Sequence, residues 1–399
     1  MLQFPKIRSL NQSRSSAIIS DQRSFTMSVN YNVLGLIFAS MHDAYVSELT
    51  KQRTMGSIPF GGRYRLIDFP LSNMVNSGVS EVGVITKSNY GSLLDHLGSG
   101  RDWDLSRKKG GLHLLPPYSQ TGGIYKGRLD ALNNVWSFVN HSKAQYVIMA
   151  NCDVVTTINF DPVLKQHMKS GADITLIYSK GYYDGEKNIS TTVLEFDDEK
   201  VLKDVLVAPR ISGECNIWTE MMIVSKEFLK KIVAEAASRN QFSFTREILQ
   251  AKMNEYKILG YEHKNFFTRI DSVQSYYDAN KMLLDKEKRS ALFRKSMPVY
   301  TKIGDSGPAK YGLESDIKDS LIADGCIIEG TVENSILFRG VKVGKGAVVR
   351  NCVLLQGTSV GKKCNISSVI TDKNVEISNE KVLTGSESYP LYINKNGRI

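Results

Sequence analysis

Few side chains in this 399-residue chain are spaced for covalent or metal chemistry. The five cysteines form no Cys-x-x-Cys pair and their number is odd, which predicts buried thiols in a reducing compartment. The six histidines are scattered without metal-ligand spacing, so a structural zinc site is not expected. Gly98-Ser99-Gly100 is too short to be a phosphate loop by itself. Chemistry is therefore to be sought where predicted strands end.

Short apolar runs alternate with helical stretches from Tyr31 onward. The continuous apolar run Val33–Phe38 predicts a strand buried on both faces, and further strands are expected at 82–86, 146–150 and 174–178, with a helix near 72–77. This alternation predicts a Rossmann-like α/β domain with a mostly parallel sheet. Such sheets bind ligands at the carboxyl ends of their strands. The loops after Phe38 and after Ala150 are therefore the first candidate sites.

The C-terminal part has a different texture. From residue 317 onward it is rich in Val, Ile, Gly and Asn, and aliphatic residues recur every six positions at Val343, Val349 and Leu355, then at Val360 and Ile366. This period predicts a left-handed parallel β-helix of about four coils, with a small β-sandwich as the alternative. The flat faces and ends of a β-helix would suit oligomerisation.

These patterns predict five segments: an N-terminal extension at 1–26, disordered in our interpretation, an α/β domain at 27–295, a linker at 296–316, a β-helix at 317–385 and a tail at 386–399. The extension holds four basic residues, one acidic residue and six serines. Its composition resembles a transit peptide, but a disordered tail or a start codon placed upstream of Met27 explains it as well.

Composition limits the classes of partner. The net charge of +10 favours anionic ligands such as phosphates and nucleotides. We find no basic stripe interleaved with aromatics, so nucleic-acid binding is not expected. No apolar run approaches the roughly 18 residues that span a bilayer, so no membrane partner is expected. We expect a cytoplasmic protein.

One long block carries a family resemblance. Residues 58–73 read Ile-Pro-Phe-Gly-Gly-Arg-Tyr-Arg-Leu-Ile-Asp-Phe-Pro-Leu-Ser-Asn, and further matches are Tyr-Lys-Gly-Arg-Leu-Asp-Ala-Leu at 125–132 and Ser-Tyr-Tyr-Asp-Ala-Asn at 275–280. Together with the β-helix pattern, this resembles the ADP-glucose pyrophosphorylases, or glucose-1-phosphate adenylyltransferases. The resemblance implies attack of glucose 1-phosphate on the α-phosphorus of ATP, giving ADP-glucose and pyrophosphate for glycogen synthesis. It also implies a Gly-rich phosphate loop and two carboxylates that hold Mg²⁺.

The chain departs from that family at the phosphate loop. Aligned without gaps, Ser40, Met41 and Asp43 stand where the family has glycines, and Tyr45 stands where it has an arginine. Met55 replaces a lysine that the family places toward phosphate. A charged hydrogen bond contributes about 1.5–3 kcal/mol, so losing two cations would slow catalysis by roughly 10²–10⁴-fold.

The expected magnesium site is also incomplete. Asp153 is retained after a predicted strand, but Arg269 stands where the family has its second aspartate, and Asp271 lies two residues away. We therefore expect at most a vestigial Mg²⁺ site with Asp153 as a ligand and Asp271 as a weak substitute.

These departures resemble the non-catalytic subunit of bacterial ADP-glucose pyrophosphorylase, which implies a regulatory role beside a catalytic partner in a heterotetramer. The alternative is an active enzyme with a reorganised loop that uses Asp153 and Asp271. A hexapeptide acyltransferase is a third, remote alternative, because the coils are few and hold no well-placed histidine. Whether the isolated chain forms homo-oligomers stays open.

Two further pairs are candidates for ligand binding by the same resemblance. Arg53 and Arg65 flank the Pro59-Phe60-Gly61-Gly62 segment, where some family members bind anionic effectors, so a phosphorylated metabolite could bind there. Ordinary salt bridges are the alternative. Gly127 and Asp130 lie where the family contacts the nucleotide base, which suggests residual nucleotide binding.

Overall fold

The computed structural model describes residues 32–117, 125–186 and 190–399. These described residues belong to one compact unit. The predicted N-terminal extension, residues 1–26, lies outside the described residues.

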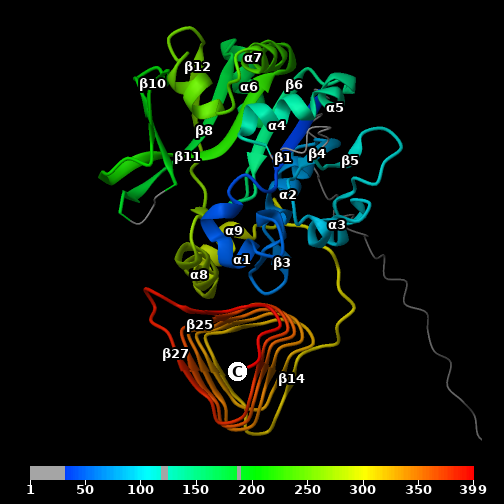
Figure 1. The fold of residues 1–399 in the computed structure, drawn as a ribbon, viewed down its shortest axis with the longest axis vertical. Helices are drawn as coiled ribbons and strands as arrows, with labels where there is room; N and C mark the ends of the chain where they lie inside the picture. Colours follow the sequence, from blue (N-terminus) through cyan, green and yellow to red (C-terminus); the bar gives the residue numbers. More distant parts are fainter. Residues whose placement is uncertain (1–31, 118–124, 187–189) are drawn as a thin grey trace, which may run out of the picture. The chain divides into compact units, whose positions relative to one another are not determined.

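A nine-stranded sheet is the centre of the α/β domain (Figure 1). Its strands are β1 (Val33–Phe38), β4 (Glu81–Ile85), β5 (Gly111–Leu115), β6 (Tyr146–Asn151), β8 (Ile174–Asp184), β9 (Thr192–Phe196), β10 (Leu202–Val207), β11 (Ser212–Ser225) and β12 (Ile258–Glu262). The main path runs β10-β9-β11-β6-β1-β4-β5, with β8 joined to β11 and β12.

The sheet is mixed. Strands β6, β1, β4 and β5 are parallel neighbours, as the apolar runs predict. Strand β11 runs antiparallel to β6, β8 and β9, because it forms a long antiparallel ribbon with β8 that returns the chain to the sheet centre. The parallel half brings the loops after β1 and β6 to one edge, where the candidate site lies.

Helices cover both faces of the sheet. Among the described residues, the α-helices of this domain are α1 (Ser47–Thr50), α2 (Asp68–Asn76), α3 (Gly91–Leu97), α4 (Arg128–Asn134), α5 (Trp136–His141), α6 (Asp161–Ser170), α7 (Lys226–Ser238), α8 (Val273–Lys281) and α9 (Lys286–Leu292). Side chains of a strand alternate between faces. Ile37 of β1 therefore joins the core cluster that includes α2, whereas Leu36 and Phe38 join the cluster that includes α4 and α7.

Two short antiparallel pairs lie beside the main sheet. Strand β2 (Pro59–Phe60) pairs with β3 (Tyr64–Arg65), within the block that carries the family resemblance. Strand β7 (Val154–Thr156) pairs with β13 (Phe267–Arg269) directly after Asp153. This second pair brings residues more than a hundred positions apart to one place.

The C-terminal domain is a left-handed parallel β-helix with a triangular outline in Figure 1. Its three five-stranded sheets are β14 (Lys310–Tyr311), β17 (Ile327–Ile328), β20 (Lys342–Val343), β23 (Ser359–Val360) and β26 (Glu376–Ile377); β15 (Asp316–Lys318), β18 (Thr331–Glu333), β21 (Val348–Arg350), β24 (Asn365–Ser367) and β27 (Val382–Thr384); and β16 (Leu321–Ile322), β19 (Ile336–Leu337), β22 (Val353–Leu354), β25 (Val369–Thr371) and β28 (Leu391–Ile393). Buried Val, Ile, Leu, Cys and Ala side chains fill its interior.

The β-helix is longer than the sequence analysis expects. Five strands stack in each sheet, compared with the four coils expected, and strand pairing runs from Lys310 to Ile393. The predicted range of 317–385 is therefore too narrow at both ends. The end strands lie outside the six-residue repeat of the central coils, and β28 follows a longer loop, so the period of aliphatic residues does not mark them.

No helix among the described residues is both long and apolar enough to cross a membrane.

Candidate functional site

Two side chains of the loop after β1 accept hydrogen bonds from backbone N–H groups. The Asp43 carboxylate accepts a hydrogen bond from the Met55 N–H at 2.8 Å, and the Ser40 hydroxyl accepts one from the Lys87 N–H at 2.8 Å. A phosphate loop instead leaves such N–H groups open to its ligand. Here the Met55 N–H is already occupied by the Asp43 side chain, and Ser40 is engaged with the segment that follows β4.

Met55 lies inside the core. Its side chain is only 2% exposed and packs in the same apolar cluster as Ile37. The direction of this side chain matters, because the family resemblance places a phosphate-facing lysine at this position. The described loop therefore presents a buried thioether where a cation is expected.

The other altered loop residues lie at its rim. Tyr45 is 43% exposed, and its ring centroid lies 5.4 Å from that of His42. Met41 is half-buried and packs against the second core cluster. Burial raises the pKa of Asp43 to about 7, although the Met55 N–H and Lys87 act to lower it.

Asp153, directly after β6, is the centre of a buried ion-pair network. His42 Nδ1 lies 2.8 Å from Asp153 Oδ2, and the Arg269 Nε lies 3.1 Å from the same oxygen. Both the Asp153 and Arg269 side chains are almost fully buried. Burial opposes ionisation of Asp153, but His42 and Arg269 outweigh it and hold the pKa of this carboxyl well below its usual range.

The backbone fixes Arg269 at this place. Arg269 pairs with Val154 in the β13–β7 ladder, and the Ile270 N–H donates a hydrogen bond to the Asp153 carbonyl at 2.7 Å. Both residues of the Asp153–Arg269 pair are thus held through their main chains. The position of the guanidinium is therefore set by the backbone of β13 as well as by the conformation of the side chain.

Glu220 extends the network through an unusual backbone conformation. It lies in a bulge of β11, where the register shifts between Trp218 and Met221, and has a φ of 58°. Such conformations are uncommon for residues other than glycine and occur often at functional sites. Glu220 Oε2 accepts a hydrogen bond from Arg128 at 2.7 Å, and its Oε1 lies 3.8 Å from Arg269 Nη1.

Arg128 is the second buried cation of this network. It also donates to Asn151 Oδ1 at 3.0 Å, and its guanidinium stacks over the rings of Phe38 and Trp218 at 5.1 and 5.3 Å. Asp153, Glu220, Arg128 and Arg269 thus compensate one another inside the protein.

These donors do not suit a magnesium ion. Mg²⁺ requires octahedral oxygen coordination and retains several waters. Asp271 accepts a hydrogen bond from the Ser190 hydroxyl, while Asp153 Oδ1 is a single buried oxygen without a hydrogen bond among the described residues. Across the described ranges, no three His, Cys, Asp or Glu side chains are arranged to hold a metal. The residues present do not fit the expected Mg²⁺ site.

Gly127 and Asp130 have local structural partners. A Cβ added at Gly127 would lie 2.2 Å from the Phe242 carbonyl oxygen, so this position requires glycine for close packing at the start of α4. Asp130 accepts hydrogen bonds from the Lys126 N–H and from Asn134. Their part in nucleotide binding stays a prediction.

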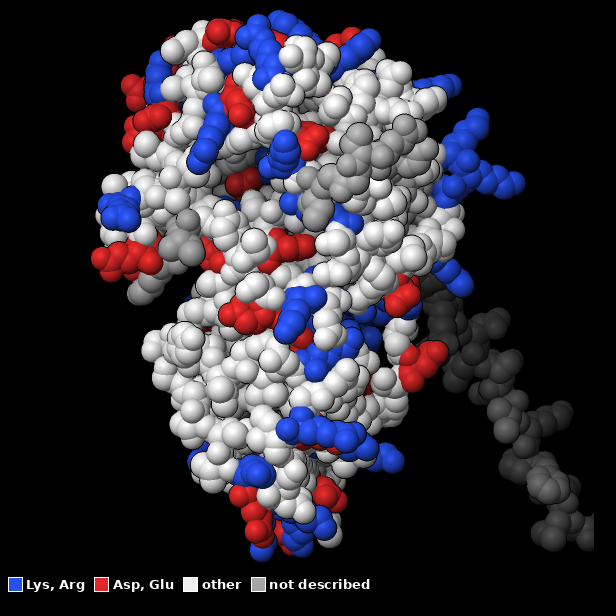
Figure 2. Space-filling model, viewed as in Figure 1, with Lys and Arg blue, Asp and Glu red and all other residues white. Residues whose placement is uncertain are grey.

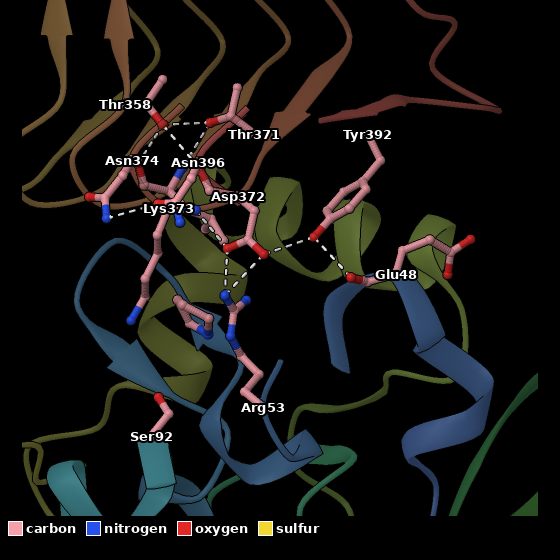
Figure 3. A network of polar contacts seen from close by, with 12 residues as sticks. Glu48, Arg53, Ser92, Thr358, Thr371, Asp372, Lys373, Asn374, Tyr392 and Asn396 are labelled. Atoms are coloured by element: carbon pink, nitrogen blue, oxygen red, sulfur yellow. Dashed lines mark hydrogen bonds and ion pairs between the residues drawn. The ribbon is translucent and has the colours of Figure 1, made fainter. Parts of the chain in front are cut away.

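Arg53 joins the α/β domain to the β-helix. Its Nη2 donates to both carboxylate oxygens of Asp372, at 2.7 and 3.0 Å, and both side chains are buried. The Tyr392 hydroxyl, with one proton to donate, lies 2.9 Å from an oxygen of the same carboxylate and 3.0 Å from the Glu48 carbonyl oxygen (Figure 3). Arg53, predicted as an anion ligand, is thus committed to a carboxylate of the protein.

Arg65 lies in a basic hollow of about 200 Å³ between the same two domains. The α/β domain contributes Arg63 and Arg65, the connecting segment contributes Lys302, and the β-helix contributes Arg339 and Lys373. Burial, with help from Arg65 and Arg53, lowers the pKa of Lys373 to about 7. Several cations held this close together repel one another, and a bound anion would reduce that repulsion.

Arg65 itself is oriented by α3, because its Nη1 donates to the Ser92 carbonyl at 2.5 Å and to the Ser92 hydroxyl at 2.9 Å. Over the wider face drawn in Figure 2, basic and acidic side chains are interspersed. The side chains drawn on that face form no continuous basic stripe.

Sequence reasoning missed the residues that complete these sites. His42, Glu220, Asp372 and Lys373 have no local motif that marks them. Arg128 lies inside the matched 125–132 block, where the sequence analysis names only its neighbours. A non-glycine residue in a bulge leaves little sequence signal, and the partners of Arg53 and Arg269 are set by long-range packing.

Comparisons with known proteins agree with this architecture. The family model described as nucleotidyl transferase matches residues 45–205, and the one described as GlmU-like, C-terminal hexapeptide matches residues 308–388. The chain is 37% identical to the glycogen biosynthesis protein GlgD of Bacillus subtilis, over 92% of this chain and 96% of that protein.

Of two further relatives, one is also named GlgD and the other is named for the adenylyltransferase reaction. The protein named GlgD from Geobacillus stearothermophilus is 35% identical over 80% of this chain and 84% of its own length. A glucose-1-phosphate adenylyltransferase of Clostridium perfringens is 31% identical over 80% of this chain and 83% of its own length. The predicted resemblance is confirmed: this chain belongs to the glucose-1-phosphate adenylyltransferase family, on the branch that includes proteins named GlgD.

Proposed function

We propose that this chain is a regulatory, catalytically weak or inactive subunit of glucose-1-phosphate adenylyltransferase, acting in glycogen biosynthesis in the cytoplasm. It would assemble with a catalytic subunit into a heterotetramer and adjust that subunit's turnover. Relatives named for glycogen biosynthesis and relatives named for the adenylyltransferase reaction both support this assignment.

The positions of Met55 and Asp43 in and beside the loop after β1 are the observation that carries the proposal. Phosphoryl and nucleotidyl transfer depend on positioning and on neutralising phosphate charge with cations and N–H groups. The Met55 side chain is buried in the core, and the Met55 N–H donates to Asp43. A polyphosphate at this loop would meet a carboxylate instead of a lysine. Loss of two cations alone corresponds to roughly 10²–10⁴-fold in rate.

The alternative of an active enzyme finds less support in the site. That reading needs Asp153 and Asp271 to share a metal ion. The Asp153 carboxylate is paired with Arg269, and the Asp271 carboxylate accepts a hydrogen bond from Ser190.

A small anionic effector is the proposed ligand of the basic hollow. Arg65, Arg339 and Lys373 line it from both domains, so a phosphate or sulfate group there would bridge the α/β domain and the β-helix. Such a bridge could carry a regulatory signal between the domains, because the ligand would bind their closed arrangement more tightly than a separated one.

Pyrophosphate release by the purified chain tests the proposal. Supplied with ATP, Mg²⁺ and glucose 1-phosphate, the chain alone should turn over at least about a hundredfold more slowly than a typical enzyme, which works at about 10 per second. Turnover within tenfold of that value would reject the regulatory assignment and favour the active-enzyme alternative.

Co-expression with a catalytic paralogue tests the positive half. We expect a stable mixed oligomer whose rate or response to phosphorylated effectors differs from that of the catalytic chain alone. A mixed oligomer with an unchanged rate and effector response would contradict a regulatory role. Substitution of Lys373 by Met in this chain alone should weaken the effector response if the basic hollow carries it.

A further inference from the structure

We propose that the Arg269 guanidinium serves as a fixed internal cation in place of a divalent metal beside Asp153, and that replacing it uncovers a metal site in this chain. The inference concerns metal binding and does not depend on the proposed regulatory role. It begins with the position of the guanidinium, 3.1 Å from Asp153 and buried with it.

Three carboxylates act on the charge of this one guanidinium. Asp153 lies in contact with it, Glu220 lies 3.8 Å from its Nη1, and Asp271 is close enough to stabilise its charge. Carboxylate oxygens are what a hard divalent cation binds in other proteins, but these three carboxylates as they stand in the described residues are not arranged to hold one. Here a side-chain cation neutralises the carboxylates without coordinating them.

The guanidinium cannot easily give way to a metal. Its residue is held by the β13–β7 ladder, and the next N–H binds the Asp153 carbonyl. A metal ion coordinated by the same Asp153 oxygen would lie roughly 2 Å from it. That places two positive charges side by side in a buried site, where like charges repel strongly. His42 occupies the same oxygen from another side.

Among the described residues, the guanidinium lacks hydrogen-bond partners for part of its N–H groups. This fits a cation that stands in for a metal ion better than it fits an ordinary structural ion pair. Its Nη1 and Nη2 atoms are buried and make no hydrogen bond within the described part of the chain. Buried arginines usually donate several hydrogen bonds. Arg269 is instead stabilised mainly by electrostatic attraction to the neighbouring carboxylates.

Binding of Mn²⁺, measured by loss of the free-ion electron paramagnetic resonance signal, tests the inference on the full chain. Wild-type protein should leave the Mn²⁺ signal as it is in buffer. Arg269→Asp removes the cation and adds a carboxylate opposite Asp153, so it should bind one equivalent at least about tenfold more tightly than wild type. Excess Mg²⁺ should release the bound Mn²⁺, and added Mg²⁺ should raise the melting temperature of this variant only.

Two matched variants assign the effect. Arg269→Lys keeps the positive charge and should behave as wild type does. Asp153→Asn in the Arg269→Asp background should abolish the gained binding. Should Arg269→Asp fail to fold by circular dichroism, Arg269→Glu removes the cation, adds a carboxylate on a longer side chain and is read in the same way.

Either of two results would overturn the inference. One is wild-type protein that binds one equivalent of Mn²⁺ and loses it on Asp153→Asn. The other is a folded Arg269→Asp or Arg269→Glu variant with no gain in Mn²⁺ affinity. Neither result bears on pyrophosphate release, so failure here and failure of the proposed function can be told apart.

Discussion

The Arg53–Asp372 pair should be a major support of the association between the α/β domain and the β-helix. Both side chains are nearly fully buried, at 2% and 6% exposure, and one guanidinium nitrogen reaches both carboxylate oxygens. Removing one partner of a buried pair leaves an uncompensated charge and costs about 3–5 kcal/mol. The variant that tests this is Arg53→Met, which keeps the apolar stem of the side chain and removes its charge.

Two features moderate the expected cost. Asp372 would keep the Tyr392 hydroxyl at 2.9 Å and the Lys373 N–H at 2.6 Å as donors. Lys373, whose pKa Arg53 helps to depress, would also be more readily protonated beside Asp372. We expect a loss of about 3 kcal/mol in the free energy of unfolding, measured by urea titration with circular dichroism.

Arg350→Met is the matched control. Arg350 and Glu333 also pair at 2.7 Å, but this pair is largely exposed, so its loss should change stability by less than about 1 kcal/mol. The double variant Arg53→Met with Asp372→Leu removes both buried charges and should be more stable than Arg53→Met alone. An Arg53→Met protein within about 1 kcal/mol of wild type would refute the reasoning, because burial would then add nothing to the pair.

Three further predictions follow from the same contacts. Asp43→Asn keeps an oxygen for the Met55 N–H but removes a carboxyl whose pKa burial raises to about 7. Wild-type stability should therefore fall as pH rises from 4 to 7, and the variant should be more stable than wild type by about 1–3 kcal/mol at pH 8 but not at pH 4, in parallel urea titrations. Sulfate binding in the basic hollow should weaken between pH 6 and 8 as Lys373 loses its proton, and calorimetry of Lys373→Met should show a flatter dependence; an unchanged slope would place the titrating group elsewhere. Gly127→Ala should lower stability by about 1–3 kcal/mol in thermal unfolding, because its Cβ would lie 2.2 Å from the Phe242 carbonyl oxygen, and a neutral result would mean that α4 can shift.

Local patterns predicted the fold well. The apolar run Val33–Phe38 is β1 with the same bounds, and the expected strand at 146–150 is β6 with one more residue. A strand buried on both faces has to be apolar throughout, so its signal is strong and local. The antiparallel ribbon of β8 and β11 was not expected, because strand direction depends on where the chain returns and not on the residues of one strand.

The candidate sites were predicted less completely. Ser40–Tyr45, where the chain departs from the family pattern, lie in the loop after β1, and Asp153 lies two residues beyond the end of β6; their functional roles stay predictions. The pairing of Arg53 with Asp372, 319 residues further along the chain, removed it from the expected anion site. The anion-binding candidates are instead Arg65 and cations that the β-helix contributes.

By itself, the sequence determined the family and the two-domain order, and it pointed to altered residues in the expected phosphate loop, because these are properties of short contiguous segments. Only the tertiary structure decided what the remaining charges do. A buried ion has to find a counter-ion, and which one it meets depends on elements distant in sequence. Arg269 meets Asp153 because β13 pairs with β7. From the sequence alone, this position was interpreted as a missing metal ligand, whereas in the structure its side chain is the cation that pairs with Asp153.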